Sequence, residues 1–255
     1  LAILDNPEAL LVCNGYKDEA FIRLALMSQK LGKKVFIVVE KLDELTLIEK
    51  AAGELGVQPN IGLRIKLVSA GQGRWSSSAG EYSKFGLNTI ELMEALEIAK
   101  SKNILDCVKL IHFHLGSQIT NIRRIKDSLK EVGRFYSELM KFGCNIQYID
   151  VGGGLGIDYD GSRSTFASST NYSVQEYAND VVYHLLEICK AEDLPHPNII
   201  SESGRAMTAH HSILVFNVLD VTSFPEWSEQ IEIADDAPEV VKEIFDVLDF
   251  ISNKN

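Results

Sequence analysis

Residues 146–156 read Ile146-Gln-Tyr-Ile-Asp-Val-Gly-Gly-Gly-Leu-Gly156, an apolar run typical of a buried strand followed directly by three glycines. Glycine has no Cβ, so bare backbone N–H groups at such a strand end can approach an anion closely. A phosphate is the natural ligand, and a tight strand-to-helix turn is the alternative interpretation. The spacing differs from the dinucleotide fingerprint G-x-G-x-x-G.

The same order of elements recurs along the chain. Apolar runs that predict strands alternate with segments whose apolar residues lie three and four positions apart, which predicts helices. The predicted strands are 10–14, 35–40, 61–67, 108–114, 146–151 and 199–202, and the predicted helices are 18–31, 42–55, 88–101, 122–142 and 174–191. This alternation implies an α/β fold with a parallel sheet, either doubly wound or closed into a barrel. Because the units show no split into two mononucleotide-binding halves, we expect an incomplete (β/α)8 TIM-type barrel with about six of its eight βα units.

The end of the chain differs in composition from the rest. Residues 211–221 read as a further extended run, which predicts the first strand of a C-terminal β-domain. Residues 226–255 hold nine of the 36 acidic residues against two lysines, and Asp236 with Glu239 three positions later predicts a capped helix start. We therefore expect a barrel domain over 1–210, a link over 211–225 and an acidic helical segment over 226–255. With no initiating Met, the chain is expected to be part of a longer protein.

Composition excludes several classes of protein. The chain is 45% hydrophobic and 24% charged, which is ordinary for a globular fold. Its net charge of −11 argues against nucleic acid as a partner. No apolar run approaches the 18 or so residues of a membrane span. Four scattered cysteines without a C-x-x-C pair are expected to be buried and reduced, which favours a cytoplasmic protein.

Two further strand ends carry candidate chemistry. His112 and His114 alternate on a strand and so face the same side; a metal site and a hydrogen-bonded core histidine are both open for His112. Glu202 and Arg205 follow the last predicted strand, either as a structural salt bridge or as contacts to opposite ends of one phosphorylated ligand. His210 and His211, which follow closely, are expected to be structural.

Together these motifs resemble the arginine decarboxylases of polyamine biosynthesis, in the alanine-racemase-like class of pyridoxal-phosphate barrel enzymes. The motifs shared across that class are Ser83-Lys-Phe-Gly86, Phe113-His-Leu-Gly-Ser117, Asp150-Val-Gly-Gly-Gly154 and Glu202-Ser-Gly-Arg205. Those that resemble the arginine enzymes in particular are Val12-Cys-Asn-Gly-Tyr-Lys-Asp18, Gly154-Leu-Gly-Ile-Asp-Tyr-Asp-Gly161 and Ala206-Met-Thr-Ala-His-His211. The resemblance covers residues 9–222.

The resemblance implies a role for each matching residue. His114 and Glu202 would be catalytic, with His114 stacked on the ring of pyridoxal 5′-phosphate and Glu202 facing its pyridine nitrogen. A carboxylate there keeps the nitrogen protonated, and the pyridinium is the electron sink of the reaction. Ser117, Arg205 and the amides of Gly152, Gly153 and Gly154 would hold the phosphate. The pocket that binds the substrate would be lined by Ile149, Asp150, Val151, Gly152, Gly153, Gly154, Leu155, Gly156, Ile157, Asp158 and Tyr159. Arg64 and Lys84 would belong to the supporting polar network.

The resemblance further implies L-arginine as substrate, agmatine and CO2 as products, a possible requirement for Mg2+, and a homo-dimer or tetramer of full-length chains. The family's Schiff-base Lys lies on a barrel strand that this chain lacks, and Lys17 belongs to a later strand end. The catalytic Cys and the substrate-selecting loop of the C-terminal domain are also missing, so we expect the fragment alone to be inactive. A sister decarboxylase for ornithine, diaminopimelate or a carboxyspermidine-type substrate stays open. So does a non-catalytic regulator, which the intact cofactor motifs disfavour.

Overall fold

The computed structural model describes residues 6, 8–70, 83–222 and 233–252. The chain divides into two compact units, Leu1–Ser212 and Ile213–Asn255. The first unit carries every candidate site residue, and the second carries one helix, α7 (Glu239–Ser252).

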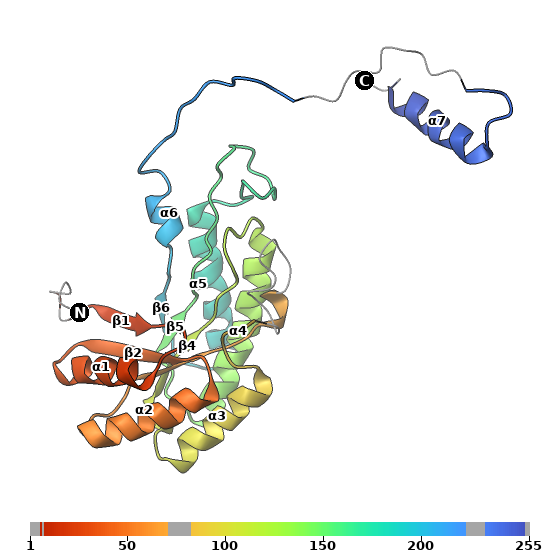
Figure 1. Ribbon diagram of the computed structural model, residues 1–255. Coiled ribbons are helices and arrows are strands. Elements are labelled where there is room, and N and C mark those ends of the chain that lie inside the picture. The colour runs from red at the N-terminus through yellow and green to blue at the C-terminus, as the bar shows by residue number, and fades with distance from the viewer. Residues whose placement is uncertain (1–5, 7, 71–82, 223–232, 253–255) are drawn as a thin grey trace. The chain divides into compact units, whose positions relative to one another are not determined.

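The first unit is built on one parallel sheet whose strand order equals the chain order (Figure 1). Its strands are β1 (Leu10–Cys13), β2 (Lys34–Val39), β3 (Ile61–Arg64), β4 (Val108–His112), β5 (Tyr148–Asp150) and β6 (Asn198–Ile200). All neighbours pair in parallel, so every strand ends at the same edge of the sheet. That carboxyl edge therefore collects the residues that follow each strand.

The helices that connect the strands match the predicted segments closely. They are α1 (Glu19–Lys30), α2 (Leu42–Leu55), α3 (Thr89–Ser101), α4 (Ile122–Phe142) and α5 (Val174–Ala191), with a short α6 (Gly204–Thr208) after β6. Local capping explains several boundaries: Asn88 with Glu91 and Ser173 with Glu176 form capping boxes at the starts of α3 and α5. Gly143, with φ of 105°, ends α4 in the left-handed region.

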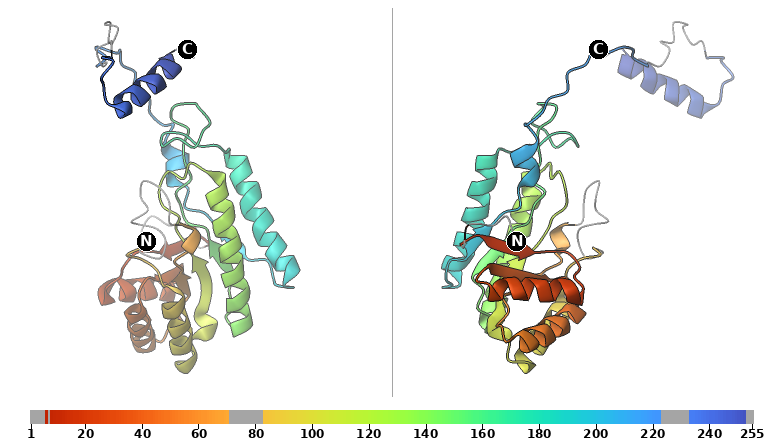
Figure 2. Two further views of the ribbon diagram at one scale, coloured as in Figure 1. Left: turned by 90° about the vertical axis from the view of Figure 1, so that its right-hand side faces the viewer. Right: turned by 60° about the vertical axis from the view of Figure 1, so that its left-hand side comes forward.

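The packing decides between the two sheet architectures that the sequence left open. Figures 1 and 2 show α1 to α5 along one face of a curled sheet. The main core lies between that face and the helices and includes Val35, Ile37 and Val39, whereas Phe36, Val38 and Leu110 form a small second cluster on the other face. A doubly wound sheet would carry helices on both faces. The fold is therefore the expected incomplete TIM-type barrel.

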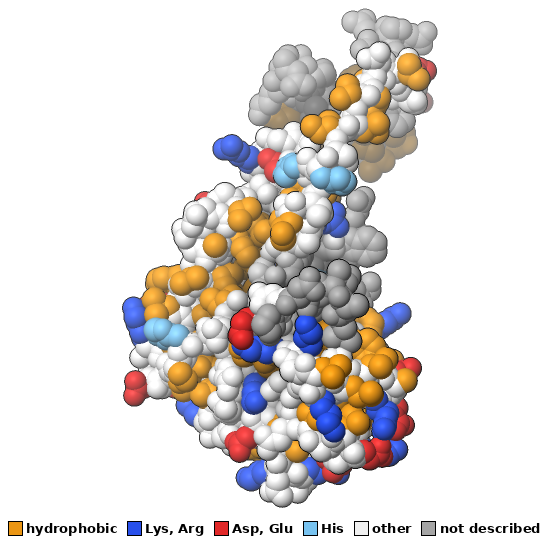
Figure 3. All heavy atoms as spheres, turned by 90° about the vertical axis from the view of Figure 1, so that its left-hand side faces the viewer, with side chains coloured by type: hydrophobic (Ala, Val, Ile, Leu, Met, Phe, Trp, Pro, Cys, Tyr) orange, Lys and Arg blue, Asp and Glu red, His pale blue; other side chains and the backbone are white. Residues whose placement is uncertain are grey.

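Helix α1, beside the edge strand β1, leaves an apolar stripe at the surface. Phe21, Leu24, Met27 and Leu31 recur every three or four positions and are all exposed. Figure 3 shows the face on this side of the molecule, with apolar side chains at the surface among charged ones. None of the helices in the described ranges is long and apolar enough to cross a membrane.

Three predictions about elements are wrong in detail. Residues 211–221 form no strand, because an extended segment needs a neighbouring strand for its hydrogen bonds and the described residues provide none there. Helix α7 begins at Glu239 and not at an Asp236 cap, since the Pro238 carbonyl accepts its first hydrogen bond, from Val241. The strands β3 to β6 are shorter than predicted: β3 ends at Arg64, after which Ile65 forms only an isolated bridge with Leu87, and β5 begins at Tyr148.

Candidate active site at the carboxyl edge of the sheet

The three glycines after β5 are explained first by close backbone packing. A Cβ added to Gly152 would lie 2.1 Å from the Phe113 carbonyl oxygen, and one on Gly154 would lie 2.1 Å from that of Gly116. A Cβ on Gly153 would lie 2.6 Å from the carbonyl oxygen of Glu202. The glycine turn is thus wedged between the loops after β4 and β6, and any larger residue would push them apart.

Two of the three glycine amides already have partners. The Gly152 N–H donates to Asp150 Oδ1 at 2.9 Å, and the Gly153 N–H donates to His114 Nδ1 at a long 3.4 Å. Gly152 is therefore a weaker candidate for phosphate binding than its two neighbours.

Arg205 lies in α6 and reaches back across the loops. Its guanidinium donates to Ser117 Oγ at 2.9 Å and to the Tyr159 hydroxyl at 3.1 Å. It forms no ion pair with any described residue, Glu202 included, so the structural salt bridge that the sequence left open is not formed. The guanidinium is oriented by neutral hydroxyls beside the glycine turn, an arrangement that suits an anion.

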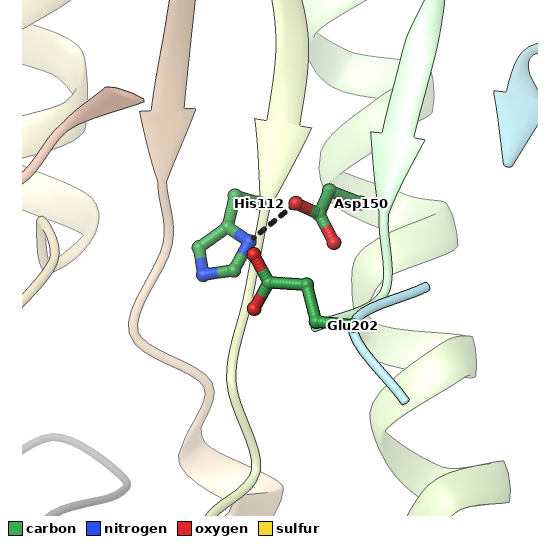
Figure 4. A group of neighbouring side chains, drawn as sticks. All are labelled: His112, Asp150 and Glu202. Atoms are coloured by element: carbon green, nitrogen blue, oxygen red, sulfur yellow. Dashed lines mark ion pairs between the residues drawn. The ribbon is translucent and has the colours of Figure 1, made fainter. Parts of the chain in front are cut away.

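Glu202 lies on the other side of the turn, facing two buried side chains. Figure 4 shows His112 from β4, Asp150 from β5 and Glu202 after β6 pointing toward one another. His112 Nδ1 and Asp150 Oδ2 are 3.2 Å apart, but they are not aligned as a hydrogen bond, so both buried atoms lack such a partner among the described residues. His112 is thus a buried histidine beside a carboxylate, and its Nδ1 lacks the hydrogen bond that the core interpretation expects.

This group is poorly suited to the Mg2+ that the resemblance implies. The donor atoms of His112, Asp150 and Glu202 come within 4.8 Å of one another. Mg2+ prefers oxygen ligands in octahedral geometry, whereas one of these donors is an imidazole nitrogen. Both carboxylates also already accept hydrogen bonds, Asp150 from Gly152 and Glu202 from Asn14. We therefore assign the group to hydrogen bonding and electrostatics around Glu202.

The surroundings shift the pKa values of two site residues. Burial, followed by the nearby charges of Arg64 and His112, lowers the pKa of His114, which keeps its imidazole neutral near pH 7. Partial burial and then Asp150 raise the pKa of Glu202, while His112, Asn14 and Arg64 act against that rise. Glu202 is therefore a carboxyl group whose charge depends on its neighbours.

A second layer of polar contacts lies under the loops after β1 and β2. Lys17 is buried and places its ammonium 3.3 Å from Glu44 Oε2, while also donating to the carbonyls of Gly15 and Val38. Its ammonium is thus fully engaged below the site by Glu44 and two backbone carbonyls. Glu40 accepts from the Gly15 N–H at 2.6 Å and from Arg64 at 3.0 Å.

Of the two residues expected in the supporting polar network, the structure places one there and not the other. Arg64 belongs to it through Glu40. Lys84 is exposed, and no hydrogen bond or ion pair joins it to these groups among the described residues.

Segment 149–159 is largely inaccessible to a ligand. Ile149, Val151, Leu155 and Ile157 are buried in the apolar interior, as is the carboxylate of Asp150. Tyr159, by contrast, is 56% exposed. The residues of this segment that a small molecule can reach are Gly153, Gly154, Gly156, Asp158 and Tyr159.

Glu40 was given no role by reasoning from the sequence, and Asn14 was quoted within a motif without a role of its own. Asn14 Nδ2 donates to Glu202 Oε1, and Glu40 joins the turn after β1 to Arg64. Both directly follow a strand, so the rule that singled out His114 and Glu202 could have indicated them as well.

Comparison with known proteins gives matches over most of the chain. The family model described as "Pyridoxal-dependent decarboxylase, pyridoxal binding domain" matches residues 1–209. The biosynthetic arginine decarboxylase of Bacteroides thetaiotaomicron is 54% identical over 253 residues, which cover 99% of this chain and 40% of that protein. The chain thus spans about two fifths of the length of such relatives.

Solved structures agree with the fold. The crystal structure of the biosynthetic arginine decarboxylase from Campylobacter jejuni matches with a TM-score of 0.71 at 36% identity, covering 95% of this chain and 39% of that one. Diaminopimelate decarboxylase from Helicobacter pylori, in complex with L-lysine, matches with a TM-score of 0.61 at 27% identity, covering 78% of this chain and 45% of that one.

Proposed function

Because the chain belongs to the family of pyridoxal-dependent decarboxylases, through their pyridoxal binding domain, we propose that the whole protein decarboxylates L-arginine to agmatine and CO2 in polyamine biosynthesis. The observation that carries this proposal is the 54% identity to a biosynthetic arginine decarboxylase over nearly the entire chain. The weaker likeness to diaminopimelate decarboxylase makes a sister substrate the less favoured alternative.

The donor set beside the glycine turn fits the phosphate of pyridoxal 5′-phosphate. Arg205 supplies a positive charge that no described carboxylate neutralises, and Ser117 supplies a hydroxyl 2.9 Å from it. Gly153 and Gly154 are partly exposed in the same turn, and the Gly153 N–H makes only a long hydrogen bond of 3.4 Å, to His114. We assign phosphate binding to Ser117, Arg205, Gly153 and Gly154, with Gly152 shaping the turn.

The other end of the site fits the ring. His114, whose lowered pKa keeps it neutral, offers a flat face for stacking. Glu202 offers a carboxylate that can hold a proton on a pyridine nitrogen. When bound, pyridoxal phosphate supplies an electron sink for the electron pair left as CO2 departs. Asn14, His112 and Arg64 favour the ionised carboxylate against burial and Asp150.

Substrate contacts and assembly belong to the same proposal. Asp158 and Tyr159 are the residues of segment 149–159 whose accessible side chains can touch L-arginine. The Schiff-base Lys and the catalytic Cys would come from parts of the longer protein outside these residues, and full-length chains would form a homo-oligomer. Four free, buried cysteines fit a reducing compartment such as the cytoplasm.

The test uses full-length protein with and without added pyridoxal 5′-phosphate. L-Arginine, L-ornithine and diaminopimelate are supplied separately, and CO2 and the amine product are measured. We expect agmatine from arginine, an absorbance band at roughly 420 nm, and no turnover by residues 1–255 alone. Preference for ornithine or diaminopimelate would contradict the substrate assignment, and a protein that stays colourless after reconstitution would contradict the cofactor.

A further inference from the structure

Asn14 and Glu202 come from opposite edges of the sheet. Asn14 directly follows β1, Glu202 lies just beyond β6, and four strands separate β1 from β6. The Asn14 amide nitrogen nevertheless donates a hydrogen bond to Glu202 Oε1 across 188 positions of sequence. The curl of the sheet thus brings its two edges within reach of one side-chain contact at the carboxyl end.

Asn14 is itself held in place by the turn after β1. The neighbouring Gly15 N–H donates to Glu40 Oε1 at 2.6 Å, and Glu40 is fixed in turn by Arg64. Lys17 secures the far side of the same turn through Glu44. The amide that faces Glu202 is therefore mounted on a rigid base, which a positioning contact requires.

The Asn14 side chain has one polar atom engaged and one not. Its Oδ1 is buried without a hydrogen-bond partner among the described residues. Rotating the amide by 180° would direct this oxygen at the Glu202 carboxylate, where two acceptors would repel each other. The Glu202 carboxylate therefore favours the orientation in which the Asn14 N–H points toward it, although Asn14 Oδ1 is then left without a hydrogen bond.

We propose, resting on the function proposed above, that Asn14 is a positioning residue that holds Glu202 Oε1 and keeps the carboxylate ionised, leaving the second oxygen to act on the cofactor ring. A neutral amide suits this task better than a cation. A lysine or arginine in its place would form an ion pair and compete with the ring nitrogen for the carboxylate. An amide orients the carboxylate without neutralising it.

The charged groups around Glu202 show what Asn14 adds. Asp150 on β5 disfavours the carboxylate, whereas His112 on β4 and Arg64 on β3 favour it. Glu40, directly after β2, lies beside Arg64 and offsets part of its charge, and burial lowers the pKa of His114. Asn14 is the neutral member of the set, so its effect does not change with pH.

The decisive test replaces Asn14 in full-length protein reconstituted with pyridoxal 5′-phosphate. Asn14→Asp keeps the shape but exchanges the donor for an acceptor, so Glu202 should take up a proton at higher pH than in the parent. We expect kcat for arginine to fall about 10- to 100-fold, with KM little changed. The acidic limb of the kcat profile should move to higher pH.

Two variants separate positioning from folding. Asn14→Ala should move the acidic limb in the same direction but less, because it removes the donor without adding a charge. Asn60→Asp is the matched control at the amino end of β3, where Asn60 bonds the Val35 carbonyl and Lys109; it should leave the limb in place. An unchanged limb in Asn14→Asp would overturn the proposal, even if that variant were less stable.

The contact can be tested independently of the reaction. In cofactor-free full-length protein, the melting temperatures of Asn14→Ala, Glu202→Ala and the double variant form a cycle. We expect the double variant to lose less than the sum of the two single losses. Additive losses would overturn the contact itself, whereas a parent that does not turn over arginine would overturn only the proposed function.

Discussion

Charged side chains have different partners in two regions of the molecule. One region, here called the scaffold side, lies at the loops after the first three strands, and the other, the ligand side, lies at the loop after the sixth strand. Below the first group of loops, buried charges have charged partners: Lys17 with Glu44, and Arg64 with Glu40. After β6, Glu202 and Arg205 are held by neutral amide and hydroxyl groups. A charge with a counter-charge mainly fixes the fold, whereas one held by neutral groups keeps its charge for a ligand.

The largest effect is expected on the scaffold side. Lys17→Met leaves the fully buried Glu44 without its counter-charge, which should lower the free energy of unfolding by about 3–5 kcal/mol. Denaturant unfolding of the cofactor-free protein measures this change. The affinity of the folded variant for pyridoxal 5′-phosphate should stay close to the parent's, since Lys17 bonds to Glu44, Gly15 and Val38 and does not contact Arg205.

The control for this prediction is an exposed ion pair of the same kind. Lys50 lies 3.2 Å from Glu19 at the surface, so Lys50→Met should cost no more than about 1 kcal/mol. Equal losses for the two lysine variants would mean that burial does not distinguish these pairs, and the comparison would fail.

On the ligand side, Glu202→Gln keeps shape and hydrogen bonding but removes the charge that favours a protonated pyridine nitrogen. We expect kcat in the full-length enzyme to fall about 100- to 1000-fold, with KM for arginine changed little, because the charge acts in the transition state. Steady-state kinetics and a melting curve check this together. A near-parent kcat with a lower melting temperature would place Glu202 on the scaffold side instead.

Arg205 should affect retention of the cofactor and not folding. Arg205→Ala removes a charge-assisted contact to phosphate, so the dissociation constant for pyridoxal 5′-phosphate should rise about 10- to 100-fold. Titration of cofactor-free protein followed by absorbance measures it. Arg205→Lys should restore only part of the affinity, because an ammonium cannot form the paired contacts of a guanidinium. Unchanged affinity in Arg205→Ala would make this residue structural.

The smallest effect concerns pH and has opposite signs at two carboxylates. Because the pKa of Glu202 is raised, its contribution to stability is present at low pH and is lost as pH rises through the raised value. Hydrogen bonds from Ser168 and Ser162 lower the pKa of Asp160 to about 2. Its contribution is therefore present above 3.8, its ordinary value, and is lost as pH falls through about 2.

Melting curves of cofactor-free parent, Glu202→Gln and Asp160→Asn over a pH series test this difference. As pH rises, the parent should lose stability relative to Glu202→Gln and should gain it relative to Asp160→Asn. If the stability difference between parent and variant changed with pH in the same direction for both variants, the surroundings of Glu202 would not disfavour its charged form.

Much of the fold follows from local sequence. The boundaries of α2, α4 and α5 match the predicted segments, because apolar spacing and capping residues act over three or four positions. The same locality explains the errors. The run at 211–221 has the composition of a strand. A strand forms only when a neighbouring strand takes up its backbone hydrogen bonds, and composition does not show whether such a neighbour is present.

The glycine turn shows where prediction from sequence stopped. Its position after a buried strand was evident, and an anion was the natural inference. That each missing Cβ makes room for a carbonyl of another loop could not be foreseen, since Phe113, Gly116 and Glu202 approach the turn only through the packing of β4 and β6 against β5.

The order of apolar and polar residues along the chain by itself determined that strands and helices alternate, and that His114, Gly152–Gly154, Glu202 and Arg205 gather at one edge of a parallel sheet. The tertiary structure alone decided which charges pair with charges and which with neutral groups. Whether Asn14 reaches Glu202 depends on how far the whole sheet curls. That curl is the sum of the twist and packing of all six strands and is encoded at no single position.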